Sequence, residues 1–432
     1  MAHVMPFSCM RVNPSYVSEV TSLPFDFFSD SEAIEYLLSH PKSFLHLDAA
    51  GISFPKEISE TGKVGFDYAS KLITEYKEEG IYINDNEPAF YLYRITSPNG
   101  ESNTGLISSV SVDDYKNGLV KKHESTRKAK EEGCKHLMKT LGAQTSPLFL
   151  TYPSKGKLSK MLDRVKESER PLYSFIDDLN YLNEVWRLTA RRETEEIINL
   201  FSEVEALYIA DGHHRAAAAA SLAEEYACEL PRKKTMSTNK LSESESSSTH
   251  RLSGFGTFMA IIFPSNETHI YDYNRAVVGL NNLTEIQFFD KIQENFTLEG
   301  PFSGVIKPDS KGTFGMYLNG NWYKLTFKKS LQGMNPVEKL DVSLLQNYIL
   351  DPILGITDPK VDNRLDFVRG TRGVRALESR IVNGEPASVC FSLYPTQVEE
   401  FFAVADAKLL MPPKSTWFEP KPRSGILMYP FQ

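Results

Sequence analysis

An apolar segment that leads through a polar turn into an alanine-rich segment is the feature that most constrains the fold of this chain. The apolar segment is ALYIA (206–210), the turn is Asp211-Gly212-His213-His214-Arg215, and AAAAASLAEEYACEL (216–230) follows. The short apolar run is typical of a buried strand, and alanine has the highest helix propensity of all residues. Gly212 permits a sharp turn between the two. The pattern therefore predicts a strand, a tight turn and a helix.

The turn carries groups that suit an anion. Backbone N–H groups at the start of a helix have no partner within the helix, and together with the helix dipole they attract negative charge. Arg215 can make a bidentate contact with a phosphate or carboxylate, and His213 and His214 can donate hydrogen bonds or transfer protons. The alternative is that Asp211 only caps the helix and that the side chains of His213, His214 and Arg215 are merely solvated.

A zinc site is a weaker interpretation of the same histidines. Adjacent histidines at a helix start point in different directions, and no HExxH or CxxC motif accompanies them. His123 and Glu124 would have to complete such a site from elsewhere in the chain. The metal therefore stays undetermined.

Three other segments are candidates for chemistry. KKHESTRK (121–128) follows a strand-like segment and is expected to open a helix, which would make Glu124 a candidate general base; the alternative is a charged helix start on the surface. MPPKSTWFEPK (411–421) offers Lys414, Ser415 and Thr416 to a phosphate, unless it is only a rigid buried loop. Within the short Gly-Thr-Arg-Gly run, Arg372 is a further anion-binding candidate. A P-loop and a complete dinucleotide fingerprint are both missing from the sequence.

Strand-like and helical patterns alternate along the whole chain, which predicts a mixed α/β fold, of the α/β or α+β kind. We expect a helix capped by Ser29 or Asp30, an amphipathic helix over 56–80 and a polar helix over 121–141. PRKKTMSTNKLSESESSSTH (231–250) has almost no large apolar residues. The predicted division is therefore an N-terminal part (1–228), a flexible insertion (229–252) and a C-terminal part (253–432) that completes the site.

Charge and cysteine usage exclude several classes of protein. The chain has 48 basic and 56 acidic residues, a net charge of −8, so it has no general basic field for nucleic acid. The four cysteines are far apart and form no CxxC pair, which argues against a disulfide scaffold and for a reducing compartment. With no apolar run long enough to span a bilayer and no secretory signal, we expect a cytoplasmic protein that binds no membrane.

Several motifs, in this order, resemble one family over residues 5–428. They are PFSCMRVNP, SLPFDFFS, KKHEST, LYIADGHHRAAAA, RLDFVRGTRG and VADAKLLMPPKSTWFEPK. The family is domain of unknown function 1015. This chain departs from the family pattern in having Leu23-Pro24-Phe25-Asp26 for Pro-Pro-Tyr-Asp, Lys122 for the proline before His-Glu, and Ala216 for the tyrosine after the turn.

The turn also resembles the motif of the ParB/sulfiredoxin fold, in particular that of free L-serine kinases. The resemblance implies a ParB/sulfiredoxin-like core, in which Asp211 assists the serine hydroxyl or the metal. It further implies that Gly212, His213, His214 and Arg215 bind phosphates, with His123, Arg372, Lys414, Ser415 and Thr416 as additional substrate or phosphate ligands. Glu124 is the expected base, with Asp26 in reserve.

The resemblance to free L-serine kinases implies a small-molecule kinase that phosphorylates free L-serine to O-phosphoserine with ATP or ADP and Mg²⁺. Its expected partners are L-serine and a nucleotide, with no nucleic acid. Two alternatives remain: a ParB-like nucleotide switch that phosphorylates no metabolite, and a metal-dependent phosphate-ester hydrolase that uses the histidines. The phosphate donor and the oligomeric state are not determined by the sequence.

Overall fold

The computed structural model describes residues 2–52, 54, 63–154, 157–229, 254–382 and 388–431. It has two units, which are described separately. Unit 1 contains residues 1–121, 125–268 and 420–432, and unit 2 contains residues 122–124 and 269–419. The polypeptide therefore leaves unit 1 twice and returns to it for its last thirteen residues.

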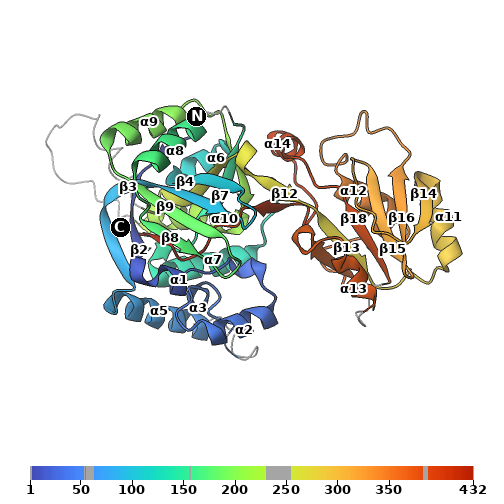
Figure 1. Cartoon of the computed structure of the whole chain (residues 1–432), viewed down its shortest axis with the longest axis horizontal. Helices are drawn as coiled ribbons and strands as arrows, with labels where there is room; N and C mark the ends of the chain where they lie inside the picture. Colours follow the sequence, from blue (N-terminus) through green and yellow to red (C-terminus); the bar gives the residue numbers. More distant parts are fainter. Residues whose placement is uncertain are drawn as a thin grey trace. The chain divides into compact units, whose positions relative to one another are not determined.

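Unit 1 is built on one large mixed sheet, visible in Figure 1. Its main strand order is β5-β10-β7-β11-β4-β3-β2-β20-β6, with β1 added to β4 and the hairpin β8–β9 added to β3. Strand β10 lies parallel to β5 and antiparallel to β7, while β7 and β11 are parallel. The strands are β1 (Val4–Met5), β2 (Phe7–Val12), β3 (Tyr82–Thr96), β4 (Ser102–Ser111), β5 (Val120–Lys121), β6 (Ala143–Gln144), β7 (Leu148–Tyr152), β8 (Tyr173–Ile176), β9 (Leu182–Leu188), β10 (Leu207–Asp211), β11 (Thr257–Pro264) and β20 (Leu427–Pro430).

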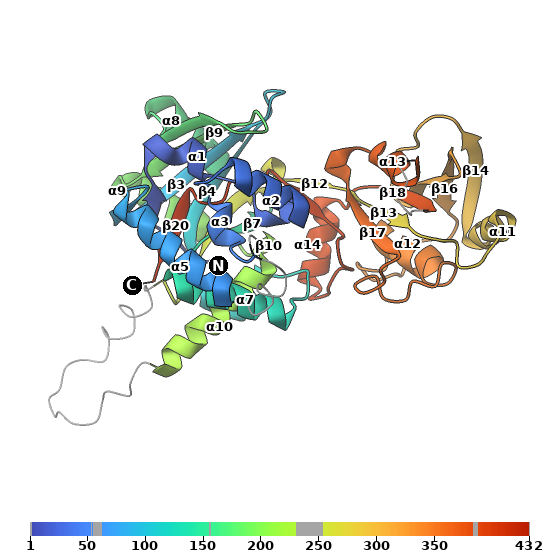
Figure 2. The ribbon, with the colours of Figure 1, turned by 90° about the horizontal axis from the view of Figure 1, so that it is seen from below.

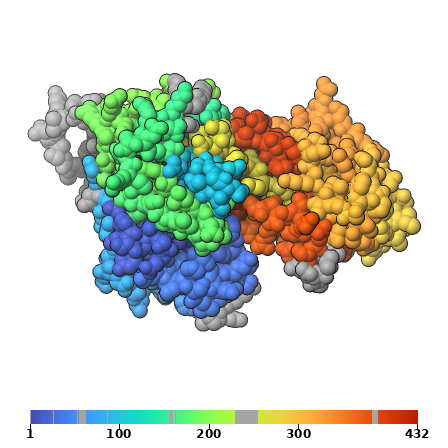
Figure 3. All heavy atoms as spheres, viewed as in Figure 1, coloured from blue at the N-terminus to red at the C-terminus, as the bar shows by residue number. Residues whose placement is uncertain are grey.

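Helices cover this sheet because alternate strand residues on both faces are apolar and buried. One face packs against α8, α9 and α10, whose buried residues include Val165, Phe201 and Ala219. Figure 1 shows α8 and α9 on one side of unit 1 and α2, α3 and α5 on the other, and Figure 3 shows all heavy atoms in the same view. The helices are α1 (Val17–Val20), α2 (Asp30–Ser39), α3 (Leu45–Asp48), α5 (Lys63–Glu78), α6 (Val112–Lys116), α7 (Lys128–Leu141), α8 (Lys157–Ser168), α9 (Arg191–Phe201) and α10 (His213–Glu229), with short turns η1 (Pro14–Tyr16), η2 (Phe25–Phe27) and η4 (Ser265–Glu267).

Unit 2 contains an antiparallel sheet in the order β14-β16-β15-β18-β13-β17 and a separate two-stranded ribbon, β12-β19. Figure 2 shows α11 beside β14 at one end of this sheet. The strands are β12 (His269–Tyr271), β13 (Tyr273–Val277), β14 (Phe296–Phe302), β15 (Thr313–Leu318), β16 (Asn321–Phe327), β17 (Leu365–Arg369), β18 (Val389–Leu393) and β19 (Trp417–Glu419). The helices are α11 (Glu285–Asn295), α12 (Asp341–Leu345), η5 (Gln346–Leu350), η6 (Gly370–Arg372), α13 (Ala376–Val382) and α14 (Val398–Asp406).

The predicted mixed α/β class is confirmed, and so is the helix start at Ser29. The Ser29 hydroxyl accepts a hydrogen bond from the Glu32 N–H, and the Glu32 side chain accepts one from the Ser29 N–H, which is a capping box. None of the helices in the described part of the chain has the length and apolar character that a membrane span requires.

The expected helix over 121–141 is wrong in about its first two turns, because α7 begins only at Lys128. Residues 122–124 belong to unit 2, and the His123 carbonyl accepts a hydrogen bond from the Met411 N–H instead of one from its own helix. Glu124 therefore lies in an irregular segment before the helix rather than opening it.

The division of the chain also differs from the one expected. Strand β11, which the sequence placed in the C-terminal part, pairs with β4 and β7 in the sheet of unit 1. Most of the predicted insertion (229–252) lies outside the described residues, as does the first part of the helix expected over 56–80.

Candidate functional site

The strand, turn and helix predicted around residue 211 are all present in unit 1. Strand β10 ends at Asp211, and α10 starts at His213. Gly212 between them has a φ of 94°, a left-handed conformation that favours glycine. A Cβ atom at this position would lie 2.9 Å from Leu148 Cδ2 and 3.2 Å from the Arg215 guanidinium. Glycine is therefore required both by the backbone conformation and by the close packing of the turn.

Asp211 is held at the start of α10 by two donors. Its Oδ1 accepts a hydrogen bond from the Gly212 N–H at 2.7 Å, and its Oδ2 lies 2.6 Å from the ammonium group of Lys421. The Lys421 side chain is only 7% exposed, compared with 32% for Asp211. Burial alone would raise the pKa of Asp211, but the charges of Lys421 and Arg215 and the two hydrogen bonds outweigh it. The pKa of this carboxyl therefore lies well below its usual range, and the group is ionised.

Arg215 is in the first turn of α10, where its charge acts on Asp211. Its Nη1 donates a hydrogen bond of 2.8 Å to the carbonyl of Pro147, which fixes the guanidinium at the start of β7. Among the described residues, none accepts a hydrogen bond from the other N–H groups of this guanidinium. The guanidinium is thus held in place and keeps donors for a further acceptor.

His214 connects the turn to the segment that precedes α7. Its Nε2 accepts a hydrogen bond of 3.0 Å from the backbone N–H of Arg127, so the ring proton is on Nδ1. Burial and the nearby charge of Lys130 lower the pKa of His214 below its ordinary value. At neutral pH His214 is therefore a neutral positioning residue. His213 is buried, with 5% of its surface exposed.

These residues place two cations and an ionised carboxylate, which is paired with one of them, at the start of α10. Lys421 and Arg215 supply two positive charges at the N-terminus of a 17-residue helix, whose dipole adds to their attraction for anions. Because its pKa is so low, Asp211 is a weak base at neutral pH and suits the role of a hydrogen-bond acceptor or metal ligand. Among the described residues there is no group of three or more His, Cys, Asp or Glu side chains placed to hold a metal.

Apart from Asp26, the other residues selected from the sequence lie in unit 2. His123 is buried, and its ring contacts those of Phe401 and Phe418, with centroids 4.7 and 6.1 Å away. Glu124 is partly exposed, and Arg372 is exposed in η6. Within unit 1, the structure thus brings Asp211, Gly212, His213, His214 and Arg215 together.

The MPPKSTWFEPK segment (411–421) divides between the units. Lys414 is exposed, Thr416 is partly exposed, and the buried Ser415 hydroxyl donates a hydrogen bond of 2.7 Å to the Pro412 carbonyl. Lys421, at the end of the same segment, belongs to unit 1 and reaches Asp211. Sequence reasoning selected the lysine beside the hydroxyl residues and missed Lys421. The sequence did contain one signal for Lys421, because it is the second lysine of the same motif. For Asp26 the structure describes the backbone, within η2, and not the side chain.

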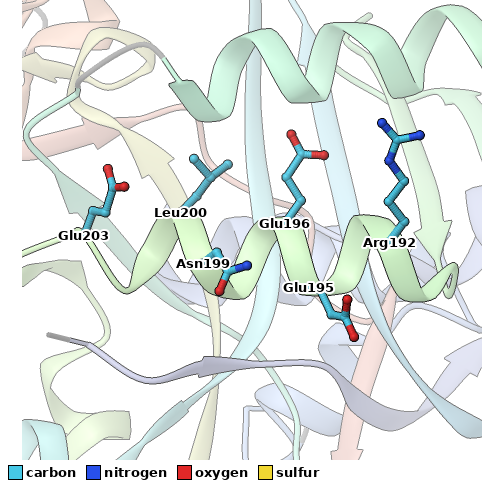
Figure 4. A pocket seen from close by; sticks show the side chains of 6 residues that line it. All are labelled: Arg192, Glu195, Glu196, Asn199, Leu200 and Glu203. Atoms are coloured by element: carbon cyan, nitrogen blue, oxygen red, sulfur yellow. The ribbon is translucent and has the colours of Figure 1, made fainter.

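A separate hollow of about 380 Å³ lies along α9. Figure 4 shows its lining side chains, which are Arg192, Glu195, Glu196, Asn199, Leu200 and Glu203. Glu196 is also bound to Arg164 at 2.6 Å. None of the residues selected from the sequence lines this hollow.

A family model described as "Protein of unknown function (DUF1015)" matches residues 4–343. The chain belongs to the DUF1015 family. The comparison with curated proteins gives no match.

Several solved structures are similar to this DUF1015 protein at low identity. Free serine kinase in complex with AMP is 11% identical, with a TM-score of 0.35 over 74% of this chain and 90% of that chain. SbnI from Staphylococcus aureus, with a C-terminal truncation, is 10% identical, with a TM-score of 0.36 over 74% and 85% of the two chains. A conserved hypothetical protein from Pyrococcus furiosus is 11% identical, with a TM-score of 0.30 over 73% and 90%.

Proposed function

We propose that this protein is a small-molecule kinase that phosphorylates free L-serine to O-phosphoserine with ATP or ADP. The observation that carries the proposal is the ionised Asp211 beside the buried Lys421 at the N-terminus of α10. Two cations and a helix N-terminus suit the phosphate groups of a nucleotide, and the adjacent carboxylate suits a hydroxyl group. The resemblance of the turn to that of free L-serine kinases supports serine as the acceptor.

In the proposed reaction the protein forms no covalent bond to the substrates. The serine hydroxyl oxygen forms a bond to the terminal phosphorus of the nucleotide, the bond between that phosphorus and the bridging oxygen breaks, and the hydroxyl proton passes to a base. The products are O-phosphoserine and the nucleotide with one phosphate fewer. Lys421 and Arg215 would hold the phosphates and offset their charge, while Asp211 would accept a hydrogen bond from serine. Glu124 remains our proposal for the base.

Magnesium fits this arrangement in part. Mg²⁺ bound to nucleotides commonly takes one or two protein carboxylates and completes its shell with phosphate oxygens and water. Asp211 is the described side chain that would hold it, since its carboxylate stays ionised. When bound, the ion would neutralise charge on the phosphates.

The test is a product assay by mass spectrometry. Purified protein is incubated with L-serine, Mg²⁺ and either ATP or ADP, beside Asp211→Asn, Glu124→Gln and the control Asp113→Asn, which changes an exposed aspartate of the same unit. We expect O-phosphoserine from the wild type and the control, and a loss of at least about 100-fold in D211N and E124Q, the range expected for a catalytic group. Nucleotide binding without O-phosphoserine would reject the kinase and favour a nucleotide-dependent switch. Full activity in E124Q would remove Glu124 as the base.

A further inference from the structure

Helices α7 and α10 of unit 1 lie side by side and run in the same direction, and Figure 2 shows α7 beside α10. At the start of the pair, His214 Nε2 accepts a hydrogen bond from the Arg127 N–H. Further along, the Lys135 ammonium group binds Glu225 at 2.6 Å. Because the contacts follow the same order along both helices, the helices are parallel, and their two N-termini lie at the same end of the pair.

The positive ends of two helix dipoles therefore lie together, at a place where acidic side chains or anions are stabilising. The residues found there are mostly basic. Arg127 is the N-cap residue of α7, and Lys128 and Lys130 follow in its first turn, which also contains Glu131. The first turn of α10 contains Arg215 and no acidic residue. Cations at this end repel the helix dipoles, so these side chains work against the stability of the free protein.

The basic residues at the start of α7 are not neutralised by ion pairs. Arg127, Lys128 and Lys130 are exposed, and none of them forms an ion pair with a residue in the described part of the chain. Arg127 and Lys130 are three residues apart and share one face of the helix, whereas Lys128 lies about 100° from Arg127. Arg127 and Lys130 are therefore the pair of cations that can act on one ligand.

The cations of the two helices act on one small region. Burial lowers the pKa of His214, and the charges of Lys130 and Arg127 lower it further. Burial raises the pKa of the Cys134 thiol, and the charges of Arg215 and Lys130 oppose that rise. The charge of Lys130 thus reaches the same region as the charge of Arg215, although the two residues belong to different helices.

Three carboxyl groups act on His214 or Cys134, and none forms an ion pair with the three basic residues at the start of α7, as far as the structure describes the chain. Asp211 is paired with Lys421. Glu131 accepts a hydrogen bond from the Thr126 hydroxyl. The third is Asp48 of α3. The carboxyl groups at this end are therefore fewer than the cations.

We propose that Arg127 and Lys130 bind the terminal phosphate of the nucleotide, next to the phosphate that Arg215 and Lys421 would hold. The inference rests on the proposed function, because it takes a nucleotide as the ligand, and it adds a second helix to that site. A chain of phosphates carries enough negative charge to offset the excess of cations, and it is long enough to contact cations of both helices. The site therefore selects nucleotides by their number of phosphate groups.

The test is isothermal titration calorimetry of the full-length protein with AMP, ADP and ATP at fixed concentrations of salt and Mg²⁺. The variants are Arg127→Gln and Lys130→Gln. The hydrogen bond to His214 comes from the backbone of Arg127, so R127Q retains it. Lys77→Gln is the control, because Lys77 is an exposed lysine of α5 that forms no ion pair with the described residues.

We expect the wild type to bind ADP and ATP more tightly than AMP. R127Q and K130Q should each weaken the binding of ADP and ATP about five- to ten-fold, the loss expected for one charge-assisted contact, and leave the binding of AMP unchanged. K77Q should change none of the three affinities. A loss of the same size for AMP and ATP would overturn the proposal, as would an equal loss in K77Q, because both indicate a general effect of net charge.

A second measurement needs no ligand. Glutamine and lysine have similar helix propensities, so K130Q removes the charge and changes little else. Because the Lys130 charge repels the helix dipoles and its basic neighbours, the midpoint of urea unfolding should be higher in K130Q than in the wild type, and unchanged in K77Q. An equal or lower midpoint in K130Q would mean that the charge of Lys130 is already balanced within the protein, which would overturn the proposal.

This inference and the proposed kinase reaction can fail separately. Formation of O-phosphoserine, together with unchanged binding of ADP and ATP in R127Q and K130Q, would overturn the inference and leave the kinase standing. Weaker binding in both variants without any O-phosphoserine would support the inference and reject the kinase. A wild type that binds none of the three nucleotides would overturn both.

Discussion

Replacing Lys421 by methionine is predicted to destabilise unit 1 through the charge that it leaves behind. Methionine has nearly the same length and apolar stem as lysine but no ammonium group, so Asp211 would lose its closest counter-charge, 2.6 Å away. Burial, which the Lys421 charge now outweighs, would then act on the carboxyl and raise its pKa.

The expected cost follows from the exposure of the two side chains. Removing one partner of a fully buried ion pair costs about 3–5 kcal/mol. Asp211 keeps 32% of its side-chain surface exposed, so solvent would stabilise part of the unpaired charge. We therefore expect a loss of about 2 kcal/mol for K421M, and a loss for D211N as well, because asparagine removes the negative charge that lies 2.6 Å from the 7% exposed Lys421. The double variant D211N/K421M should lose much less stability than the sum of the two single losses, because it contains neither charge.

The assay is urea unfolding at pH 7, followed by the fluorescence of Trp186, which is buried in unit 1. Trp322→Phe and Trp417→Phe remove the signal of unit 2. Because the folded-state pKa of Asp211 is lowered, the pair stabilises the fold fully above the unfolded-state pKa of about 3.9, and this contribution is lost as the pH falls further. The difference between wild type and K421M should accordingly be complete at pH 7 and shrink below about pH 4. If the loss of stability in D211N/K421M equals the sum of the losses in D211N and K421M to within about 0.5 kcal/mol, the two side chains are not coupled and the reasoning is refuted.

Three further predictions concern single positions. Gly212→Ala should cost about 1–3 kcal/mol, because φ is 94° and the new Cβ would lie 2.9 Å from Leu148; unchanged urea stability would contradict this. His214 should titrate below its usual pKa of about 6.5, so its hydrogen bond from Arg127 should stabilise the fold above that pH and be lost as the pH falls; NMR titration of the ring with a His214→Ala comparison measures both. Burial raises the pKa of Asp341 to about 7, so the wild type should lose stability from that carboxyl as the pH rises from 4 to 7. Asp341→Asn should flatten this dependence of the free energy of unfolding on pH. Parallel pH profiles of the wild type and the variant would contradict the prediction.

Much of the local structure follows from the sequence because it depends on neighbouring residues. The turn at 211–215 was predictable, since a strand, a glycine and an alanine run each have a strong local preference. The capping box at Ser29 was predictable for the same reason.

What the sequence could not provide depends on contacts between distant segments. Lys421 lies 210 residues from Asp211, and no pattern within its own motif separates it from Lys414 as the partner of that carboxyl. The late start of α7 has a similar cause, since the His123 carbonyl is bound by the Met411 N–H.

The most direct test of the central claim follows the phosphorus atom itself. ³¹P NMR of the wild-type protein with L-serine, Mg²⁺ and either ATP or ADP reports the donor and the product in the same spectrum. We predict that O-phosphoserine appears in equal amount to the nucleotide that has lost one phosphate, and that omission of serine stops the loss. Release of inorganic phosphate without O-phosphoserine would contradict the account and favour a hydrolase, and an unchanged nucleotide spectrum with both donors would contradict it as well.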